Sequence, residues 1–214
     1  MPRDILVNRP SQQTSIEAVE KAALELLAVR GFDDTSAEEI AAAAGISRRT
    51  FFRYFGTKNN IPFGNYAALL RELEDWLLSQ PDDRPMFEVI VEAVVRFNRV
   101  HTDGPVAHRE RMELIMHTPA LRANAALVNA EWQAVLARYA AERMGEPVEA
   151  LGPQLVAHVS LGAASAAYEQ WLRDESSDLV VVMQRAFEMA QALPDLEAGK
   201  ATRRRGKRRP TSGR

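Results

Sequence analysis

Apolar residues recur at intervals of three and four along most of the chain, which is the period of an amphipathic helix. The first stripe runs from Ile16 to Leu27 and stops at Gly31, and similar stripes occupy residues 87–97, 128–139 and 179–190. The β-rich stretch 179–182 would also suit a strand, but its spacing and the preceding serines favour a helix. The pattern predicts an all-α protein of about nine helices with no sheet.

Two short helices joined by a tight turn are predicted between residues 36 and 58, which read SAEEIAAAAGISRRTFFRYFGTK. Ser36 followed by Glu39 has the spacing of a capping box, which opens the first helix. A glycine then ends this helix in the left-handed conformation, and Ser47 caps a second helix over about residues 48–54. Such a unit is a helix-turn-helix, whose second helix lies in the major groove of DNA.

The second of these helices carries side chains suited to contacting DNA. Phe51 and Phe55 lie four residues apart and are expected to pack inward on the first helix. The opposite side is left with groups suited to base edges, because an arginine fork matches guanine and a phenyl ring can meet a thymine methyl; these are Arg48, Arg49 and Phe52. Hydroxyl and cationic groups suited to phosphate oxygens come from Ser47, Thr50, Arg53, Tyr54 and Lys58.

The chain resembles the DNA-binding domain of the TetR family of regulators in one long ordered motif, RGF followed by TS-x-E-x-IA-x-AAG-I-S-RRTFFRYF-x-x-K. It is also similar to an actinobacterial branch that includes the mycofactocin-system regulators, in FNRVH, HRERMELIMHTPALRANAALVNAEWQ, LARYAAERMG and AAYEQWL. Together these segments cover most of residues 11–175. By matching positions, the resemblance implies phosphate contacts from Ser36, Ser47, Thr50, Tyr54 and Lys58, and base contacts from Arg48, Arg49 and Phe52. Glu38 and Glu39 stand near where some relatives carry basic residues, so no base contact is expected from the first helix.

The resemblance also implies a second helical domain that encloses a ligand cavity and pairs across a dimer axis. The sequence agrees on pairing, because small residues in 155–172 let helices approach closely and the stripe 179–190 is apolar enough for an interface. The expected interface comprises Leu155, Val159, Gly162, Ala163, Ala166, Leu179, Val182, Met183, Ala186, Phe187 and Ala190. Two-fold symmetry predicts a palindromic operator in double-stranded DNA. The predicted domains are 1–58, which binds DNA, 59–194, which binds effector and dimerises, and a basic tail over 195–214.

A set of apolar side chains, many of them aromatic or methionine, and one arginine are candidates for the effector cavity, although such stripes are more often plain core. They are Trp76, Phe87, Val91, Val94, Phe97, Arg109, Met112, Ile115, Met116, Leu127, Trp132 and Tyr168. A lipophilic small molecule is expected, and a long-chain acyl-CoA is the leading candidate because related regulators sense such molecules. By family analogy, the protein is expected to repress transcription and to release DNA when it binds its effector.

Composition narrows the class of protein further. The chain has 214 residues and no Cys, which excludes disulfides and thiolate metal sites. The formal net charge is −2, yet residues 197–214 hold eight basic residues against one acid, so any DNA contact must come from a local surface. This tail is expected to be a solvated, disordered charge run. Neither a membrane span nor the apolar core of a signal peptide is recognisable, so a cytoplasmic protein is expected.

Two other classes remain as alternatives. A helical-bundle enzyme would need a metal or cofactor site, but no Glu-x-x-His, G-x-G-x-x-G or G-x-x-x-x-G-K-[ST] occurs in the chain. The four histidines are therefore expected at the surface or the edge of the core, with no metal, no cofactor and no catalytic residue. A helical interaction module would leave Arg48 and Arg49 without a role. The sequence predicts a homodimeric, sequence-specific DNA-binding transcriptional regulator.

Overall fold

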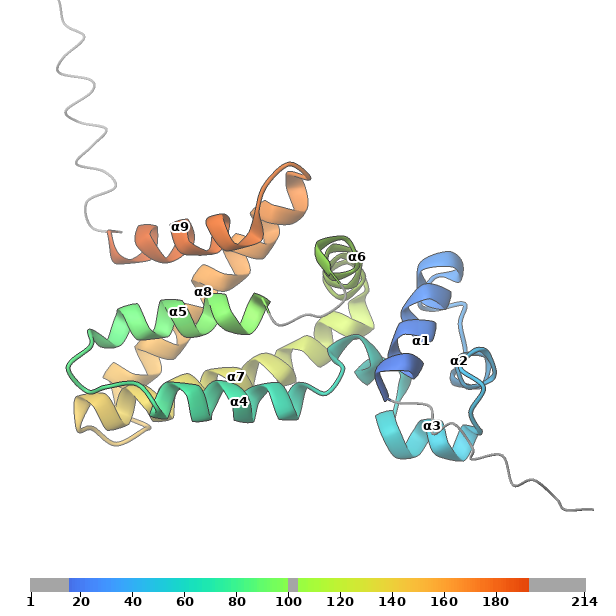
Figure 1. Cartoon of the computed structure of the whole chain (residues 1–214), viewed down its shortest axis with the longest axis horizontal. Helices are drawn as coiled ribbons and strands as arrows, with labels where there is room; N and C mark the ends of the chain where they lie inside the picture. The colour runs from blue at the N-terminus through green and yellow to red at the C-terminus, as the bar shows by residue number, and fades with distance from the viewer. Residues whose placement is uncertain (1–15, 100–103, 193–214) are drawn as a thin grey trace, which may run out of the picture. The chain divides into compact units, whose positions relative to one another are not determined.

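The structure is a computed structural model that describes residues 16–99 and 104–192 (Figure 1). Within these residues the chain forms nine α-helices and one 3-10 helix, and no strand occurs among them. The elements are α1 (Ile16–Arg30), α2 (Ala37–Ala43), α3 (Arg48–Phe55), η1 (Lys58–Phe63), α4 (Tyr66–Leu78), α5 (Met86–Arg99), α6 (Gly104–His117), α7 (Pro119–Met144), α8 (Leu151–Arg173) and α9 (Leu179–Gln191). The all-α prediction is confirmed, including a helix over residues 179–182.

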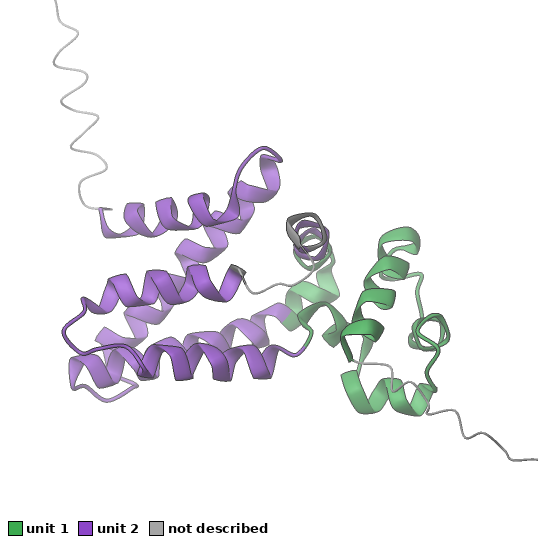
Figure 2. Ribbon diagram, in the orientation of Figure 1, with its two compact units in different colours: residues 1–64, 114–124 green, residues 65–113, 125–214 purple. Residues whose placement is uncertain are grey.

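The helices form two compact units (Figure 2). Unit 1 comprises residues 1–64 and 114–124, and unit 2 comprises residues 65–113 and 125–214. The chain therefore enters unit 1 twice, because the last turn of α6 and the first turns of α7 belong to it. The domain boundary predicted at residue 58 leaves out residues 114–124, which the structure places in unit 1. The predicted tail, 195–214, lies outside the described residues.

Unit 1 is built around the apolar stripe of α1. Val19, Ala23 and Leu27 lie one helical turn apart and are at most 1% exposed. They pack with buried residues from α2, α3, η1, α7 and the turn after α1, namely Phe32, Ile40, Ala41, Phe51, Phe55, Ile61 and Leu121. Each fully buried large side chain contributes about 1.5–3 kcal/mol of transfer free energy. This core fixes α2 and α3 against α1.

The turn between α2 and α3 has the predicted chemistry. The Ser36 hydroxyl accepts the backbone N–H of Glu39 at 3.2 Å, and the Glu39 carboxylate accepts the backbone N–H of Ser36 at 2.8 Å. This is a complete capping box. Gly45 then adopts φ +67°, and the N–H of Ile46 donates to the carbonyl of Ala41 at 2.9 Å. The left-handed glycine closes the carbonyl end of α2 and turns the chain toward α3.

Unit 2 is a bundle in which α4, α5, α7, α8 and α9 share one apolar core. Its fully buried residues include Ile90 and Val94 of α5, Leu136 of α7, and Phe187 of α9. The inner face of α8 consists mainly of alanines, which lets α9 pack along it. Within the described part of the chain, no helix is both long and apolar enough to cross a membrane.

Candidate nucleic-acid interface

Helix α3 separates an anchoring face from an exposed face. Phe51 is completely buried and Phe55 is 5% exposed, so both rings hold α3 in the core of unit 1, as predicted. Their neighbours Arg48, Arg49 and Arg53 are exposed, and Phe52 is 38% exposed. The other face of this short helix therefore presents three guanidinium groups and one phenyl ring to solvent. These are the groups that the sequence predicts for base and phosphate contacts.

Arg48 has two partners on this exposed face. Its Nε lies 2.9 Å from Oε1 of Glu38, in the first turn of α2. Its guanidinium carbon also lies 5.5 Å from the ring centroid of Phe52, one helical turn along α3. Sequence reasoning missed the ion pair, although an acid early in α2 and a base at the start of α3 were both visible. The pair contributes at most about 1 kcal/mol of stability because both side chains are exposed. Its main effect is therefore to orient the Arg48 side chain.

The candidate phosphate-binding hydroxyls also serve as helix caps. Ser47 Oγ accepts the backbone N–H of Thr50 at 3.1 Å and shares a hydrogen bond with the Thr50 hydroxyl at 2.9 Å. The Ser36 hydroxyl donates to Glu39 in the capping box at 2.8 Å. Tyr54 is half-buried, and the guanidinium of Arg53 lies 5.0 Å from its ring centroid. A phosphate at these positions must share hydroxyls that already hold the helix ends.

Lys58 has an internal role that the sequence does not predict. Its Nζ donates to the carbonyl of Phe32 at 2.8 Å and to that of Thr35 at 3.0 Å, and lies 4.3 Å from the Phe32 ring centroid. The side chain thus ties η1 to the turn between α1 and α2. Because an ammonium group has three N–H bonds, one remains for the expected phosphate contact. Lys58 is first a structural tether of unit 1.

Both acids at the start of α2 are engaged by arginines. Glu39 accepts from Arg30 Nη1 at 2.9 Å, while Glu38 pairs with Arg48. The backbone N–H of Ser36, then its hydroxyl and Arg30, hold the pKa of the Glu39 carboxyl below its ordinary value. These pairings reduce the negative field of two adjacent carboxylates beside the exposed face of α3.

The predicted effector-cavity residues do not form one group: most lie in unit 2, but Ile115 and Met116 belong to unit 1. Val94, Ile115 and Trp132 are buried. Trp76 and Phe97 line a small cavity between α4 and α5, and Met112, Met116 and Tyr168 are half-buried. Leu127 was wrongly predicted, because 68% of its surface is exposed on the outer side of α7.

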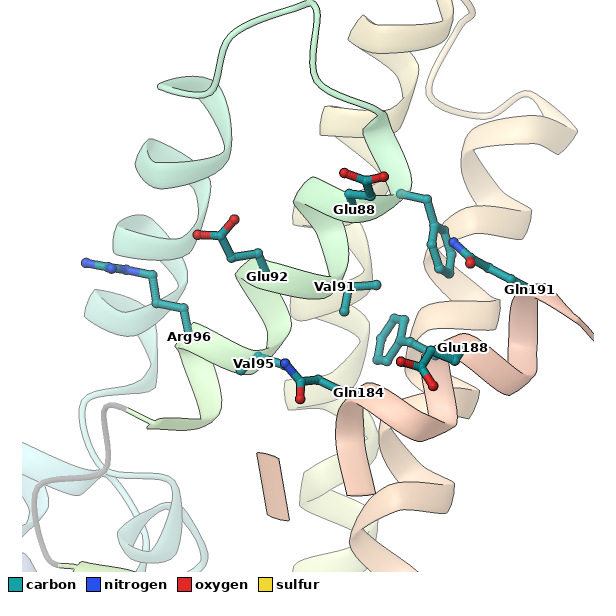
Figure 3. A pocket seen from close by; sticks show the side chains of 10 residues that line it. Glu88, Val91, Glu92, Val95, Arg96, Gln184, Glu188 and Gln191 are labelled. Carbon is teal, nitrogen blue, oxygen red and sulfur yellow. The ribbon is translucent and has the colours of Figure 1, made fainter. Parts of the chain in front are cut away.

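Phe87 and Val91 line a separate open groove of about 750 Å³ between α5 and α9 (Figure 3). Its apolar side is completed by Val95 and Phe187, and its polar side chains are Glu88, Glu92, Arg96, Gln184, Glu188 and Gln191. Glu92 also pairs with Arg84 at 2.8 Å. With Arg84 counted, three carboxylates face two arginines, and the remaining negative charge makes this groove unfavourable for an anionic group such as a phosphate.

A polar cluster lies inside unit 2. The hydroxyl of Tyr168 in α8 donates to the side-chain oxygen of Asn98 in α5. The same hydroxyl lies 3.2 Å from Nε2 of His108 in α6, and the His108 ring is 5.6 Å from that of Trp171. Burial raises the pKa of the Tyr168 hydroxyl, which keeps it a neutral donor. Sequence reasoning found Tyr168 but missed Asn98 and His108, because the three belong to different helices.

Arg109 has a structural role that the sequence does not predict. Its guanidinium lies 4.1 Å from the ring centroid of Trp171 and donates to the backbone carbonyls of Trp171 and Asp174. These carbonyls are at the end of α8, where a cation is favoured by the unsatisfied oxygens of the last turn. Arg109 is therefore a cap of α8.

The dimer surface predicted on α8 and α9 needs correction. Met183 and Phe187 are completely buried in unit 2, and Ala163 is 8% exposed, so these side chains offer almost no surface to a partner. The remaining predicted residues of α9 pack against the same core; they are Leu179, Val182, Ala186 and Ala190. The stripe covers the protomer's own bundle. Large apolar side chains that stay exposed on α8 and α9 are Leu151, Leu155, Val181 and Met189, of which the sequence predicts only Leu155. The predicted small residues Gly162 and Ala166 are exposed on α8 as well.

The described residues hold no group of three or more His, Asp or Glu side chains arranged to bind a metal. His158 is exposed and hydrogen-bonds the Gln154 carbonyl of its own helix at 2.7 Å. His101 lies outside the described residues.

Comparison with known proteins agrees with this geometry. Residues 21–61 match the profile of "Bacterial regulatory proteins, tetR family", and residues 84–194 match that of "MftR C-terminal domain". The chain is 39% identical over 193 residues to MftR of Mycobacterium tuberculosis, a relative assigned to transcriptional regulation of mycofactocin biosynthesis, covering 90% of this chain and 96% of that protein. The chain belongs to the TetR family of bacterial transcriptional regulators.

Solved structures of other transcriptional regulators share the fold. FadR from Bacillus subtilis, in complex with stearoyl-CoA, has a TM-score of 0.61 at 19% identity, with 82% of this chain and 97% of that chain covered. SmeT, the repressor of a multidrug efflux pump of Stenotrophomonas maltophilia, has a TM-score of 0.61 at 19% identity, with 85% and 90% covered. As a TetR-family member, the protein is a DNA-binding transcriptional regulator and not an enzyme.

Proposed function

We propose that the protein is a ligand-responsive repressor that binds a palindromic operator as a homodimer, with α3 in the major groove. The observation that carries this proposal is the two-sided character of α3. Phe51 and Phe55 anchor the helix in unit 1, while Arg48, Arg49 and Phe52 are exposed on the adjoining surface. Two exposed arginines contribute nothing to a core but match the acceptor pattern of guanine in the major groove.

Dimerisation is proposed to use the exposed face of α8 and α9. Large apolar side chains on a surface favour association, and Leu151, Leu155, Val181 and Met189 range from 45% to 81% exposed. Gly162 and Ala166 are exposed on the same helix α8, and their small size permits close helix packing. A two-fold axis would space the two copies of α3 by about 34–36 Å, one turn of DNA, or a multiple of it.

A lipophilic effector, with a long-chain acyl-CoA as the leading candidate, is proposed to bind in unit 2. The support is the shared fold with FadR, whose structure holds stearoyl-CoA, and the apolar set that includes Trp76, Phe97 and Trp132. The acidic groove between α5 and α9 is an unfavourable place for the CoA phosphates, so the acyl-CoA is proposed to bind elsewhere in the unit.

The conformational change that releases DNA is proposed to pass along α6 and α7. Each is a continuous helix with residues in both units. A shift of α6 would move Leu114 and a shift of α7 would move Leu121, and both side chains pack in the core of unit 1. The effector weakens DNA binding only by its differential affinity for the two shapes of the dimer. A typical coupling of about 1–3 kcal/mol corresponds to about 5–150-fold in affinity.

The regulated genes are proposed to include those of mycofactocin biosynthesis. The support is 39% identity to MftR over 90% of this chain, together with the matching C-terminal profile. An operator on the bacterial chromosome implies that the protein acts in the cytoplasm.

The proposal is tested with Arg48→Ala and Arg49→Ala against a duplex that the wild-type protein selects from a random pool. Each variant should lose about 1–3 kcal/mol of discrimination against a substituted base pair, because each removes a bidentate donor. Arg71→Ala, which removes an exposed charge from α4, is the matched control and should retain discrimination. Unchanged discrimination in both reading-helix variants would contradict the assignment of α3.

The effector is tested separately by adding stearoyl-CoA to the protein bound to the selected duplex. A loss of DNA affinity of about 5–150-fold supports the proposed effector class. Unchanged DNA affinity at saturating stearoyl-CoA would contradict that class while leaving the DNA-binding proposal intact.

A further inference from the structure

Glu38 contacts the proposed reading helix through one particular atom of Arg48. The 2.9 Å contact joins Oε1 of Glu38 to Nε, the nitrogen nearest the aliphatic stem of the arginine. The guanidinium also lies near the Phe52 ring, 5.5 Å from its centroid. Because a guanidinium has five N–H donors, the four on the two terminal nitrogens stay outside this contact. The carboxylate thus holds the arginine from its stem side and leaves the terminal fork exposed.

This arrangement should change what Arg48 can bind. An unrestrained arginine loses rotamer entropy on being fixed, and a side chain already held by partners loses less on binding. The terminal fork matches O6 and N7 of guanine in the major groove. A carboxylate beside the fork also repels phosphate oxygens, which disfavours contacts that Arg48 would otherwise make with DNA of any sequence.

We infer that Glu38 is a specificity-determining positioning residue, which orients Arg48 for guanine and lowers the affinity of the protein for non-cognate DNA. The inference rests on the proposed function, since it requires that Arg48 contacts a base. It assigns to α2 an indirect role in base recognition, through α3. Glu38 acts through Arg48 and does not itself contact DNA.

Glu39, the adjacent acid, is unsuited to this role. Its carboxylate closes the capping box of α2 and pairs with Arg30 at 2.9 Å. Removing Glu39 would therefore disturb the fold of α2, whereas Glu38 is 52% exposed and outside the capping box. Glu38 can be changed with little effect on the stability of unit 1.

The test compares Glu38→Ala with Glu38→Gln, and Glu25→Gln serves as a charge-matched control on an exposed site of α1. Affinity is measured for the selected duplex, for the same duplex with the Arg48-dependent base pair replaced, and for a scrambled duplex. Glu38→Ala should reduce the ratio of selected to replaced affinity, that is, the affinity for the selected duplex divided by that for the duplex with the replaced base pair, by about three- to tenfold. Glu38→Gln keeps an acceptor for Nε and should preserve most of that ratio. Both should bind the scrambled duplex more tightly than Glu25→Gln does.

The same measurements in an Arg48→Ala background separate this inference from the proposed function. If Glu38 acts through Arg48, Glu38→Ala should leave the ratio of selected to replaced affinity unchanged in the Arg48→Ala background. An equal effect of Glu38→Ala in both backgrounds would overturn the inference, because Glu38 would then act on DNA directly. No effect in either background would overturn it as well. If Arg48→Ala alone leaves the ratio unchanged, the proposed base contact fails instead.

Discussion

The adjacent residues Phe51 and Phe52 should respond very differently to truncation. Phe51 is completely buried and packs against the Phe55 ring at 5.4 Å between centroids, whereas Phe52 is 38% exposed. Phe51→Ala should therefore lower the unfolding free energy of unit 1 by about 3–5 kcal/mol. Phe52→Ala should cost less than about 1 kcal/mol, because it removes a partly exposed ring and leaves no enclosed cavity.

The expected loss for Phe51→Ala is large relative to the stability of a small unit. Whole domains unfold with about 5–15 kcal/mol, and unit 1 belongs at the low end because of its size. We therefore expect Phe51→Ala to abolish DNA binding through partial unfolding of unit 1. Phe52→Ala should bind DNA with reduced discrimination at one base pair while remaining folded.

The three tryptophans allow the two units to be followed separately. Trp76, Trp132 and Trp171 all belong to unit 2, so tryptophan fluorescence reports its unfolding alone, while far-UV circular dichroism reports the helices of both units. In urea, Phe51→Ala should show an early loss of helical signal that precedes the fluorescence transition. Equal destabilisation by the two substitutions, or a fluorescence transition that shifts as far as the helical one, would refute the reasoning.

Other contacts make further predictions. Lys58→Met should lower the unfolding free energy of unit 1 by about 1–3 kcal/mol in urea melts, because it removes two charge-assisted hydrogen bonds; an unaltered melt would contradict the tether. Gly64→Ala should cost about 1–3 kcal/mol of thermal stability, because φ is +57° and ψ is −143° there and an added Cβ would lie 2.8 Å from the Glu20 carboxylate. Acidification should weaken unit 1 through Glu39, whose folded pKa is lowered, so its contribution is present above its unfolded pKa and is lost as the pH falls through the folded one. Urea midpoints at neutral and acidic pH should therefore differ less in Glu39→Gln than in wild type.

The helix-turn-helix could be predicted from the sequence because its determinants are local. The capping box joins residues three apart, and the left-handed glycine at position 45 ends α2 within its own turn. Such hydrogen bonds depend on short spacings that are directly visible in a sequence. The inward spacing of Phe51 and Phe55 is local in the same sense.

The contacts that the sequence does not predict join distant segments. Lys58 reaches carbonyls 23 and 26 residues earlier, and Tyr168 meets a histidine 60 residues away. The sequence alone predicts a dimer interface for the stripe of α9, because an apolar face has the same pattern whether it covers its own core or a partner. Only the packing of α9 along α8 identifies Met183 and Phe187 as part of the protomer's core.

The most direct test of the central claim is selection of random DNA duplexes by the purified protein at near-physiological salt. A two-fold symmetric dimer that reads bases through α3 should enrich a palindrome whose half-sites are centred about one helical turn apart, or a multiple of it. Salt-sensitive binding with no enriched sequence would contradict base recognition by Arg48, Arg49 and Phe52. It would leave sequence-independent phosphate contacts as the only interaction of this protein with DNA.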